Sequence, residues 1–168
     1  MTMASHIATK LTPGVFRTWA GSSTHALLVA VREEPSRSVA EPDGSGVLGY
    51  ALLVLGEPDG AAEADAVRAA AATAGPYVEL SKIYVRPDVQ GAGVSDLLMS
   101  AAVDAAAELA HDQGHRSGLP LWLGTNGLNA RAQGFYRRHG FTTVGTRTYV
   151  VGGVEHDDVV MLHTADHG

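Results

Sequence analysis

Residues 78–98 read VELSKIYVRPDVQGAGVSDLL, and within this one stretch a strand pattern gives way to a helix pattern. Residues 78–85 are rich in apolar, β-branched and aromatic side chains, and Arg86-Pro87-Asp88 then imposes a turn. From Val94 the apolar positions recur at helical spacing and stop before Gly114. The stretch therefore predicts a strand that feeds a helix through a glycine-bearing turn.

The turn at residues 90–95, Gln90-Gly91-Ala92-Gly93-Val94-Ser95, has the composition of an anion site. The first N–H groups of a helix have no partner within the helix, and glycines without Cβ atoms let a ligand approach them closely. Backbone donors of this kind could hold a polyanion even in an acidic protein. Taken alone, however, Gly91 and Gly93 fit an ordinary strand-to-helix connection better than a binding site.

The sequence before this stretch predicts two further strands. Residues 25–31 and 47–55 are short apolar runs, which we interpret as neighbouring antiparallel strands. Residues 32–46 contain Pro35, Pro42 and Asp43-Gly44, which is typical of a surface loop. Residues 57–76, rich in Ala with Glu and Asp, predict either a short helix or a flap, and a solvated insertion is favoured over a substrate lid.

The sequence after the stretch completes a crossover. Residues 119–124 predict a buried strand, which a strand, helix, strand connection would make parallel to residues 78–85. A second helix is predicted over residues 129–138, with Asn129 as its N-cap and Gly140 as its C-terminal stop.

The C-terminal region predicts a β-hairpin. Residues 141–151 and 154–163 are two β-like runs that flank Gly152-Gly153. Together these elements predict an α/β fold, a central mixed β-sheet with flanking helices.

Size and composition narrow the function classes. A chain of 168 residues, 45% of them hydrophobic, predicts a single domain over residues 1–168. The net charge of −6 disfavours nucleic acid and anionic membranes as partners, and the lack of a signal or spanning segment predicts a cytoplasmic protein. With no Cys, an acyl-cysteine intermediate is excluded, and the eight His show no ligand spacing, so no metal is predicted.

Asn129 and Tyr136 lie seven residues apart, about two helical turns, and so share one face of the second predicted helix. That helix follows the strand parallel to residues 78–85, so its side chains could converge on a crevice at the carboxyl ends of both strands. Viewed singly, Asn129 is at least as compatible with a plain helix cap, and Tyr136 with an interface tyrosine.

Through residues 90–95 and 129–141 together, the chain resembles the GNAT superfamily of N-acetyltransferases. Residues 90–95 resemble its Q/R-x-x-G-x-G/A cofactor motif at every position but the last, and residues 129–141, NARAQGFYRRHGF, resemble its N-x-x-A-x-x-F-Y-x-x-x-G-F signature. Residues 79–93, 121–124 and 157–161 are similar to the polyamine and small-amine acetyltransferase branch. The resemblance covers about residues 47 to 163 and implies a GNAT-like sheet whose parallel strands splay around the cofactor.

The resemblance also implies roles for individual residues. Backbone groups of Ile83, Tyr84 and Val85 would pair with the pantetheine arm of acetyl-coenzyme A, and Asn129 would contact it. The pyrophosphate would be bound by the backbone amides of the turn: Gln90, Gly91, Ala92, Gly93, Val94 and Ser95. The Tyr136 hydroxyl would protonate the departing thiolate, and Glu79, six residues before Val85, is the candidate general base.

Two departures from the family pattern bear on the acceptor. Ser95 replaces the usual Gly or Ala, which a helix start tolerates. Only about two dozen residues precede His25, where the family usually places a strand and two helices, so we expect residues 12–19 or a second subunit to supply part of the acceptor pocket. A homodimer joined through the C-terminal hairpin is compatible with this expectation.

The predicted activity is transfer of an acetyl group from acetyl-coenzyme A to a primary amine by direct attack in a ternary complex. The alternatives are an acyl-coenzyme A sensor without turnover and, with less support, a plain structural domain. Glu79, Asp157 and Asp158 are compatible with a polyamine-like acceptor, although a solvated acidic hairpin is the favoured interpretation of Asp157 and Asp158.

Overall fold

The computed structural model describes residues 7–8, 23–31, 46–91 and 93–164. The chain forms two compact units, one of residues 1–54 and 80–116 and the other of residues 55–79 and 117–168. Two strands, β3 (Val47–Gly56) and β4 (Tyr77–Val85), run through both units. The predicted loop at 32–45 and the segment 12–19 lie outside the described residues.

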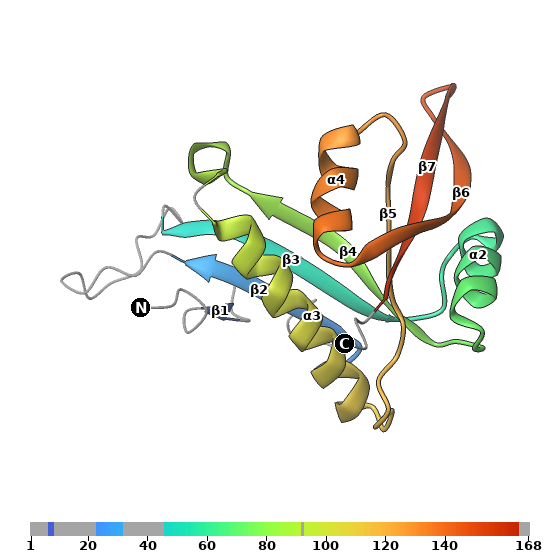
Figure 1. The fold of residues 1–168 in the computed structure, drawn as a ribbon, viewed down its shortest axis with the longest axis horizontal. Helices are drawn as coiled ribbons and strands as arrows, with labels where there is room; N and C mark the ends of the chain where they lie inside the picture. The colour runs from blue at the N-terminus through green and yellow to red at the C-terminus, as the bar shows by residue number, and fades with distance from the viewer. Residues whose placement is uncertain (1–6, 9–22, 32–45, 92, 165–168) are drawn as a thin grey trace. The chain divides into compact units, whose positions relative to one another are not determined.

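The first unit is an antiparallel sheet covered by one long helix. Its strand order is β1 (Ile7–Ala8), β2 (His25–Val31), β3 and β4, and β2 pairs with β3 antiparallel as predicted. Helix α3 (Val94–Asp112) packs on β2 (Figure 1). The two-residue strand β1 was not predicted, because so short a strand carries no periodic pattern.

The second unit has the strand order β4, β5 (Leu121–Asn126), β7 (Val154–His163) and β6 (Phe141–Val151). Strands β6 and β7 form the predicted hairpin, with Val151 paired to Val154. Gly152 and Gly153 take φ of 59° and 79°. Positive φ at both turn positions suits a two-residue hairpin, so the Gly-Gly prediction is confirmed.

Helix α2 (Ala61–Ala71) resolves the two alternatives for residues 57–76 in favour of a helix. It lies against β6 and β7 (Figure 1) and buries Val67 with Tyr77 and Trp122. A Cβ atom built on Gly145 of β6 would lie 2.5 Å from the Ala66 side chain. The missing side chain at Gly145 therefore lets α2 rest directly on the sheet.

Strands β4 and β5 form the predicted parallel pair. In the described part of the chain their ladder holds two residue pairs, Val78 with Leu121 and Glu79 with Trp122, although β4 continues to Val85 and β5 to Asn126. The mixed sheet and the flanking helices confirm the predicted fold class. Among the described helices, none combines the length and apolar character that crossing a membrane requires.

Candidate functional site

The glycine-bearing turn opens α3 as the sequence predicts. After the short 3-10 helix η2 (Pro87–Val89), Gly91 and Gly93 adopt φ of 86° and 87°, a region that side chains rarely enter. A Cβ atom on either glycine would meet nothing within 4 Å, so the space beside the turn is open. Gly93 is the N-cap of α3, and the N–H groups of Val94 and Ser95 begin the helix. Ala92 lies outside the described residues.

Side chains and backbone groups of the first unit hold this turn in place. The Gln90 side-chain amide donates to the carbonyl of Val85 at 3.3 Å, which ties the turn to the end of β4. Arg86 pairs with Asp88 at 2.6 Å and donates its backbone N–H to Leu48 at 2.8 Å. These contacts fix the turn to the end of β4 and to the first residues of β3.

The last residues of β4 differ in exposure. Ile83 is partly buried, Tyr84 is 48% exposed and Val85 is buried. The Tyr84 ring packs against Tyr50 of β3, with 5.9 Å between ring centroids. Gly49 lies directly beneath the Tyr84 carbonyl, where a Cβ atom would clash with the backbone.

Asn129 is the N-cap of α4 (Ala130–Arg138), as predicted. Its side-chain oxygen accepts a hydrogen bond from the Ala132 N–H at 3.1 Å. Gly140, with φ of 91°, follows the end of the helix. Because capping uses the oxygen of the exposed Asn129 amide, its nitrogen is the group left for a ligand.

Tyr136 lies on α4 between two aromatic rings. Its ring centroid is 5.6 Å from that of Phe135 and 6.0 Å from that of Phe141, both in edge-on geometry. Burial raises the pKa of the Tyr136 phenol. The raised pKa keeps the phenol protonated at neutral pH. No described residue hydrogen-bonds its hydroxyl, so its proton is available to a ligand.

Glu79 and Tyr136 belong to opposite faces of the sheet in the second unit. The partly buried Glu79 lies opposite Trp122 in the β4–β5 ladder, and Trp122 lies opposite Leu162 in the β5–β7 ladder. The side chains of Trp122 and Leu162 pack on the face that α2 covers. The Tyr136 ring packs on the ring of Phe141, and Phe141 lies opposite His163 in the β6–β7 ladder. His163 follows Leu162 directly in the sequence, so its side chain is on the other face. Successive strand residues point to opposite faces, so the structure does not bring these two predicted catalytic side chains together on one face.

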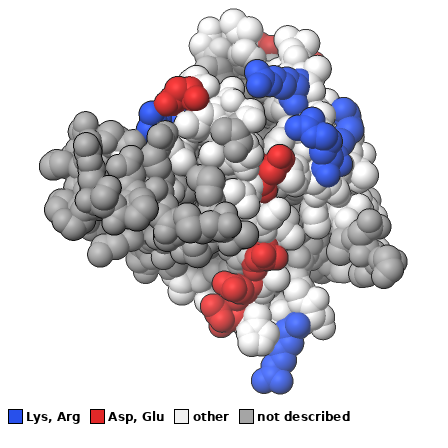
Figure 2. Space-filling model, turned by 60° about the vertical axis from the view of Figure 1, so that its left-hand side comes forward, with Lys and Arg blue, Asp and Glu red and all other residues white. Residues whose placement is uncertain are grey.

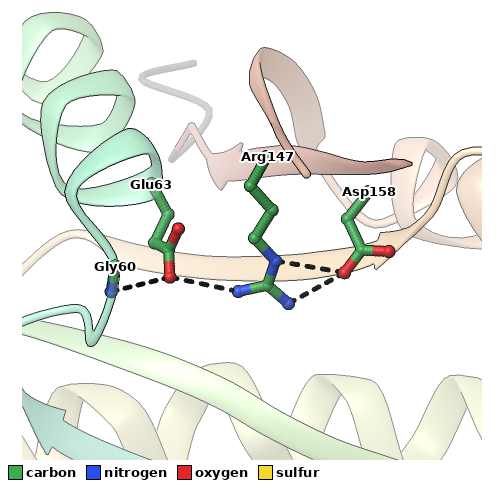
Figure 3. Close-up of polar contacts among 4 residues, drawn as sticks. All are labelled: Gly60, Glu63, Arg147 and Asp158. Carbon is green, nitrogen blue, oxygen red and sulfur yellow. Dashed lines mark hydrogen bonds and ion pairs between the residues drawn. The ribbon is translucent and has the colours of Figure 1, made fainter. Parts of the chain in front are cut away.

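A charged cluster that the sequence analysis missed lies between α2 and the hairpin (Figure 3). Arg147 of β6 contacts one oxygen of Asp158 on β7, Oδ2, through Nε at 3.1 Å and Nη2 at 3.0 Å. Its Nη1 lies 3.5 Å from Oε1 of Glu63 on α2, and that oxygen also accepts the Gly60 N–H at 2.9 Å. One guanidinium therefore joins two carboxylates from different elements.

The structure corrects the interpretation of the acidic hairpin. Asp157 is exposed and accepts a hydrogen bond from the Thr148 hydroxyl at 3.0 Å. Asp158, however, is only 5% exposed, so its interpretation as a solvated residue is wrong. The physical reason is the cross-strand position of Asp158 opposite Arg147, under the N-terminal end of α2.

A cavity of about 550 Å³ lies beside this cluster. Its lining comes from the start of α2 and from the hairpin: Asp59, Gly60, Ala61, Ala62, Glu63, Arg147, Thr148, Tyr149 and Asp158. No group of three or more His, Cys, Asp or Glu placed to hold a metal ion is found in the described ranges.

Comparisons with known proteins find a family model and a relative that match this chain. A model of the Acetyltransferase (GNAT) domain matches residues 35–143. A protein of Mycobacterium bovis, named an uncharacterized N-acetyltransferase, is 34% identical over 131 residues, which cover 77% of this chain and 68% of the relative.

Solved structures share the fold at low sequence identity. Arabidopsis thaliana NAA60 in complex with a bisubstrate analogue gives a TM-score of 0.65 at 16% identity, covering 92% of this chain and 84% of that one. The same protein in complex with acetyl-coenzyme A gives 0.63 at 14% identity, covering 94% and 85%.

Proposed function

The chain belongs to the GNAT family of acetyltransferases, and on that premise we propose that it transfers an acetyl group to a primary amine by direct attack in a ternary complex. Family membership makes it an acetyl-coenzyme A-dependent N-acetyltransferase. The nature of the acceptor, the site residues and the order of bond changes are the proposed part.

The proposed cofactor site begins at the turn. The open space beside Gly91 and Gly93 leaves room for a phosphate group, which the first N–H groups of α3 would bind with the help of the helix dipole. The backbone of Ile83, Tyr84 and Val85 would pair with the pantetheine arm. The nitrogen of the Asn129 side chain would add a donor to the same ligand.

The observation that carries the proposed reaction is the Tyr136 hydroxyl, which is protonated, half-buried and without a hydrogen-bond partner among the described residues. The amine nitrogen attacks the thioester carbon and the carbon–sulfur bond breaks. Tyr136 gives its proton to the departing sulfur, and Glu79 receives a proton from the amine. Their places on opposite faces of the sheet suit two proton transfers on opposite sides of the reacting carbon.

At pH 7, only about one in 2500 molecules of an alkyl amine is neutral, because its ammonium form has a pKa near 10.4. The acceptor therefore needs a base. That fraction corresponds to about 4.6 kcal/mol, which a positioned base and a desolvated pocket can offset. The partly buried position of Glu79 is compatible with this role, either directly or through a water.

Thiol release from acetyl-coenzyme A in the presence of a panel of primary amines tests the proposal, with mass spectrometry of the products. We expect amine-dependent thiol release and acetylated amine. Tight binding of acetyl-coenzyme A by calorimetry without acetylation of any amine in the panel would replace the proposal with a sensor role.

A further inference from the structure

We propose that Gln133 is a positioning residue: it fixes the loop of residues 127–129, between β5 and α4, so that the Asn129 side chain is placed for the pantetheine arm of acetyl-coenzyme A. This inference rests on the proposed contact between Asn129 and that arm and adds the residue through which the contact is set. Gln133 lies on α4, about one helical turn after Asn129, and is assigned no ligand contact of its own.

Gln133 is a buried amide. In the described part of the chain the buried polar side chains are those of Glu63, Gln133 and Asp158. Glu63 and Asp158 both contact the Arg147 guanidinium, whereas Gln133, 8% exposed, belongs to a different set of contacts. Burial of an amide is unfavourable unless its donors and acceptor find partners. The partners of Gln133 therefore indicate what its burial achieves.

The Gln133 side chain uses both of its N–H donors on the chain that enters the loop. Its Nε2 lies 3.1 Å from the carbonyl oxygen of Asn126, the last residue of β5, and 3.0 Å from that of Gly127. Its Oε1 accepts from Nη2 of Arg137 at 3.4 Å. Two successive carbonyls that leave the strand thus receive their donors from one side chain of α4.

Hydrogen bonds, rather than apolar packing, hold this loop. Leu128, its large apolar residue, is 94% exposed, so the packing of that side chain does not fix the loop. The Leu128 N–H donates to the Asn126 side chain at 2.8 Å, and the Gly127 N–H donates to the Asp157 carbonyl of β7 at 2.9 Å. These bonds tie the loop to β5 and to the hairpin, and the two bonds from Gln133 tie it to α4.

The fixed loop leads directly into Asn129. The Asn129 N–H donates at 3.0 Å to the Asn126 carbonyl, the same oxygen that Gln133 contacts. The Asn129 side-chain oxygen caps α4 through the Ala132 N–H. With its backbone and its oxygen held in this way, the side-chain nitrogen of Asn129 has a set direction. Gln133 therefore acts on the ligand through Asn129.

A placed donor suits the pantetheine arm, because that arm carries amide groups and no charge. Its binding depends on hydrogen-bond geometry rather than on long-range attraction. On the face drawn in Figure 2, basic and acidic side chains lie interspersed, so that face presents no broad field of one sign to orient a ligand. A donor that the fold already holds also avoids the entropy of ordering a loop on binding.

The test measures, by calorimetry, the binding of acetyl-coenzyme A and of 3′-phospho-ADP, which keeps the pyrophosphate and lacks the pantetheine arm. Gln133→Met removes both donors, and Gln133→Glu removes them but keeps an acceptor for Arg137. We expect each variant to bind acetyl-coenzyme A about tenfold more weakly and 3′-phospho-ADP as the wild type does. The KM for acetyl-coenzyme A should rise by the same factor while kcat at saturation is retained.

Gln113→Met is the matched control, because the Gln113 side-chain amide also donates to a backbone carbonyl, that of Ser23, at 2.9 Å. It should bind both probes as the wild type does. Equal weakening of both probes by the Gln133 variants would make Gln133 a general support of the fold and overturn its positioning role. Wild-type affinity for acetyl-coenzyme A in folded Gln133 variants would also overturn it.

A double-mutant cycle shows whether Gln133 acts through Asn129. Asn129→Ser keeps a capping oxygen and lacks the amide nitrogen. It should weaken acetyl-coenzyme A binding in the wild-type background and have little further effect beside Gln133→Met. Additive effects would overturn the positioning role and leave the Asn129 contact in place. Wild-type binding by Asn129→Ser would overturn both.

Hydrogen exchange of the wild-type protein decides if neither Gln133 variant folds. The N–H groups of Leu128 and Asn129 should then exchange slowly without ligand, and fast exchange would overturn a fixed loop. None of the binding or exchange outcomes depends on whether an amine is acetylated, so a failure of the proposed function is seen separately, in the thiol-release assay.

Discussion

Arg147 and Asp158 face each other across the β6–β7 hairpin, and two nitrogens of the guanidinium share one carboxylate oxygen at 3.1 and 3.0 Å. Glu63 approaches the same guanidinium from α2. The contact therefore joins the helix to the hairpin as well as strand to strand.

Arg147→Met should destabilise the fold, because it leaves the carboxylates of Glu63 and Asp158 close together in a buried site without their cation. Loss of one partner of a buried ion pair costs several kcal/mol, and since the Arg147 side chain is 25% exposed we expect about 2–3 kcal/mol. Urea denaturation measures the change. Arg68→Met, in an exposed pair with Asp65, should change the free energy of unfolding by less than about 0.5 kcal/mol. Equal effects of the two substitutions would contradict a structural role for the cluster.

Tyr136→Phe should lower kcat by about 100-fold or more and leave the affinity for acetyl-coenzyme A nearly unchanged, because only the proton donor is lost. Steady-state kinetics and calorimetry measure the two quantities. Because burial raises the pKa of Tyr136, ionisation of the phenol should reduce wild-type turnover only above the usual tyrosine pKa of about 10. A variant with unchanged turnover would remove Tyr136 from the reaction.

Gly93→Glu should abolish binding of acetyl-coenzyme A, because it places a bulky anion at the start of α3, where we propose the phosphate binds. Gly118→Glu is the control, since Gly118 also has a positive φ, 82°, and open surroundings. Calorimetry reports binding, and circular dichroism checks that both variants are folded. Tight binding by folded Gly93→Glu would end the pyrophosphate assignment.

Glu79→Gln should slow acetylation at neutral pH and recover as the pH rises, because an amine that loses its proton to solvent no longer needs the base. The measurement is kcat/KM as a function of pH. Glu155→Gln, at an exposed position of the hairpin, should keep the wild-type profile. If Glu79→Gln also follows the wild-type profile, another group or solvent accepts the proton.

His163 should make stability depend on pH. Burial lowers the pKa of His163, so the unfolded chain binds a proton more readily than the folded one between pH 6.5 and the lowered value. Stability is therefore fully present above pH 6.5 and decreases as the pH falls through that window. His163→Gln should flatten the dependence in thermal melts recorded across this range. His111→Gln, at an exposed histidine of α3, should not.

The periodic and turn signals of the sequence were enough to predict the main elements. Gly152-Gly153 predicted the hairpin because two residues with positive φ suit its turn, and Asn129 predicted the start of α4 because its side chain caps the helix. The two-residue strand β1 and the choice between helix and flap for α2 could not be predicted. Both depend on packing against residues distant in the sequence.

The charged cluster could be predicted from the sequence only in part. Counting outward from the hairpin turn pairs Arg147 with Asp158, so their cross-strand contact could have been found by extending the register. Glu63 could not, because it lies 84 positions from Arg147 and its approach depends on how α2 packs on β6. The buried, unpartnered oxygen of Asp158 is likewise a product of tertiary packing.

The close contact between Gly145 and Ala66 determines how near α2 lies to β6, and with it the width of the cavity beside α2. A single methyl group at position 145 would push α2 away from the sheet, and with it Gly60 and Glu63 at the edge of the cavity. No charge would change, yet the cavity would widen. The bulk of one β6 residue therefore sets the width of this cavity while its ionic groups stay the same.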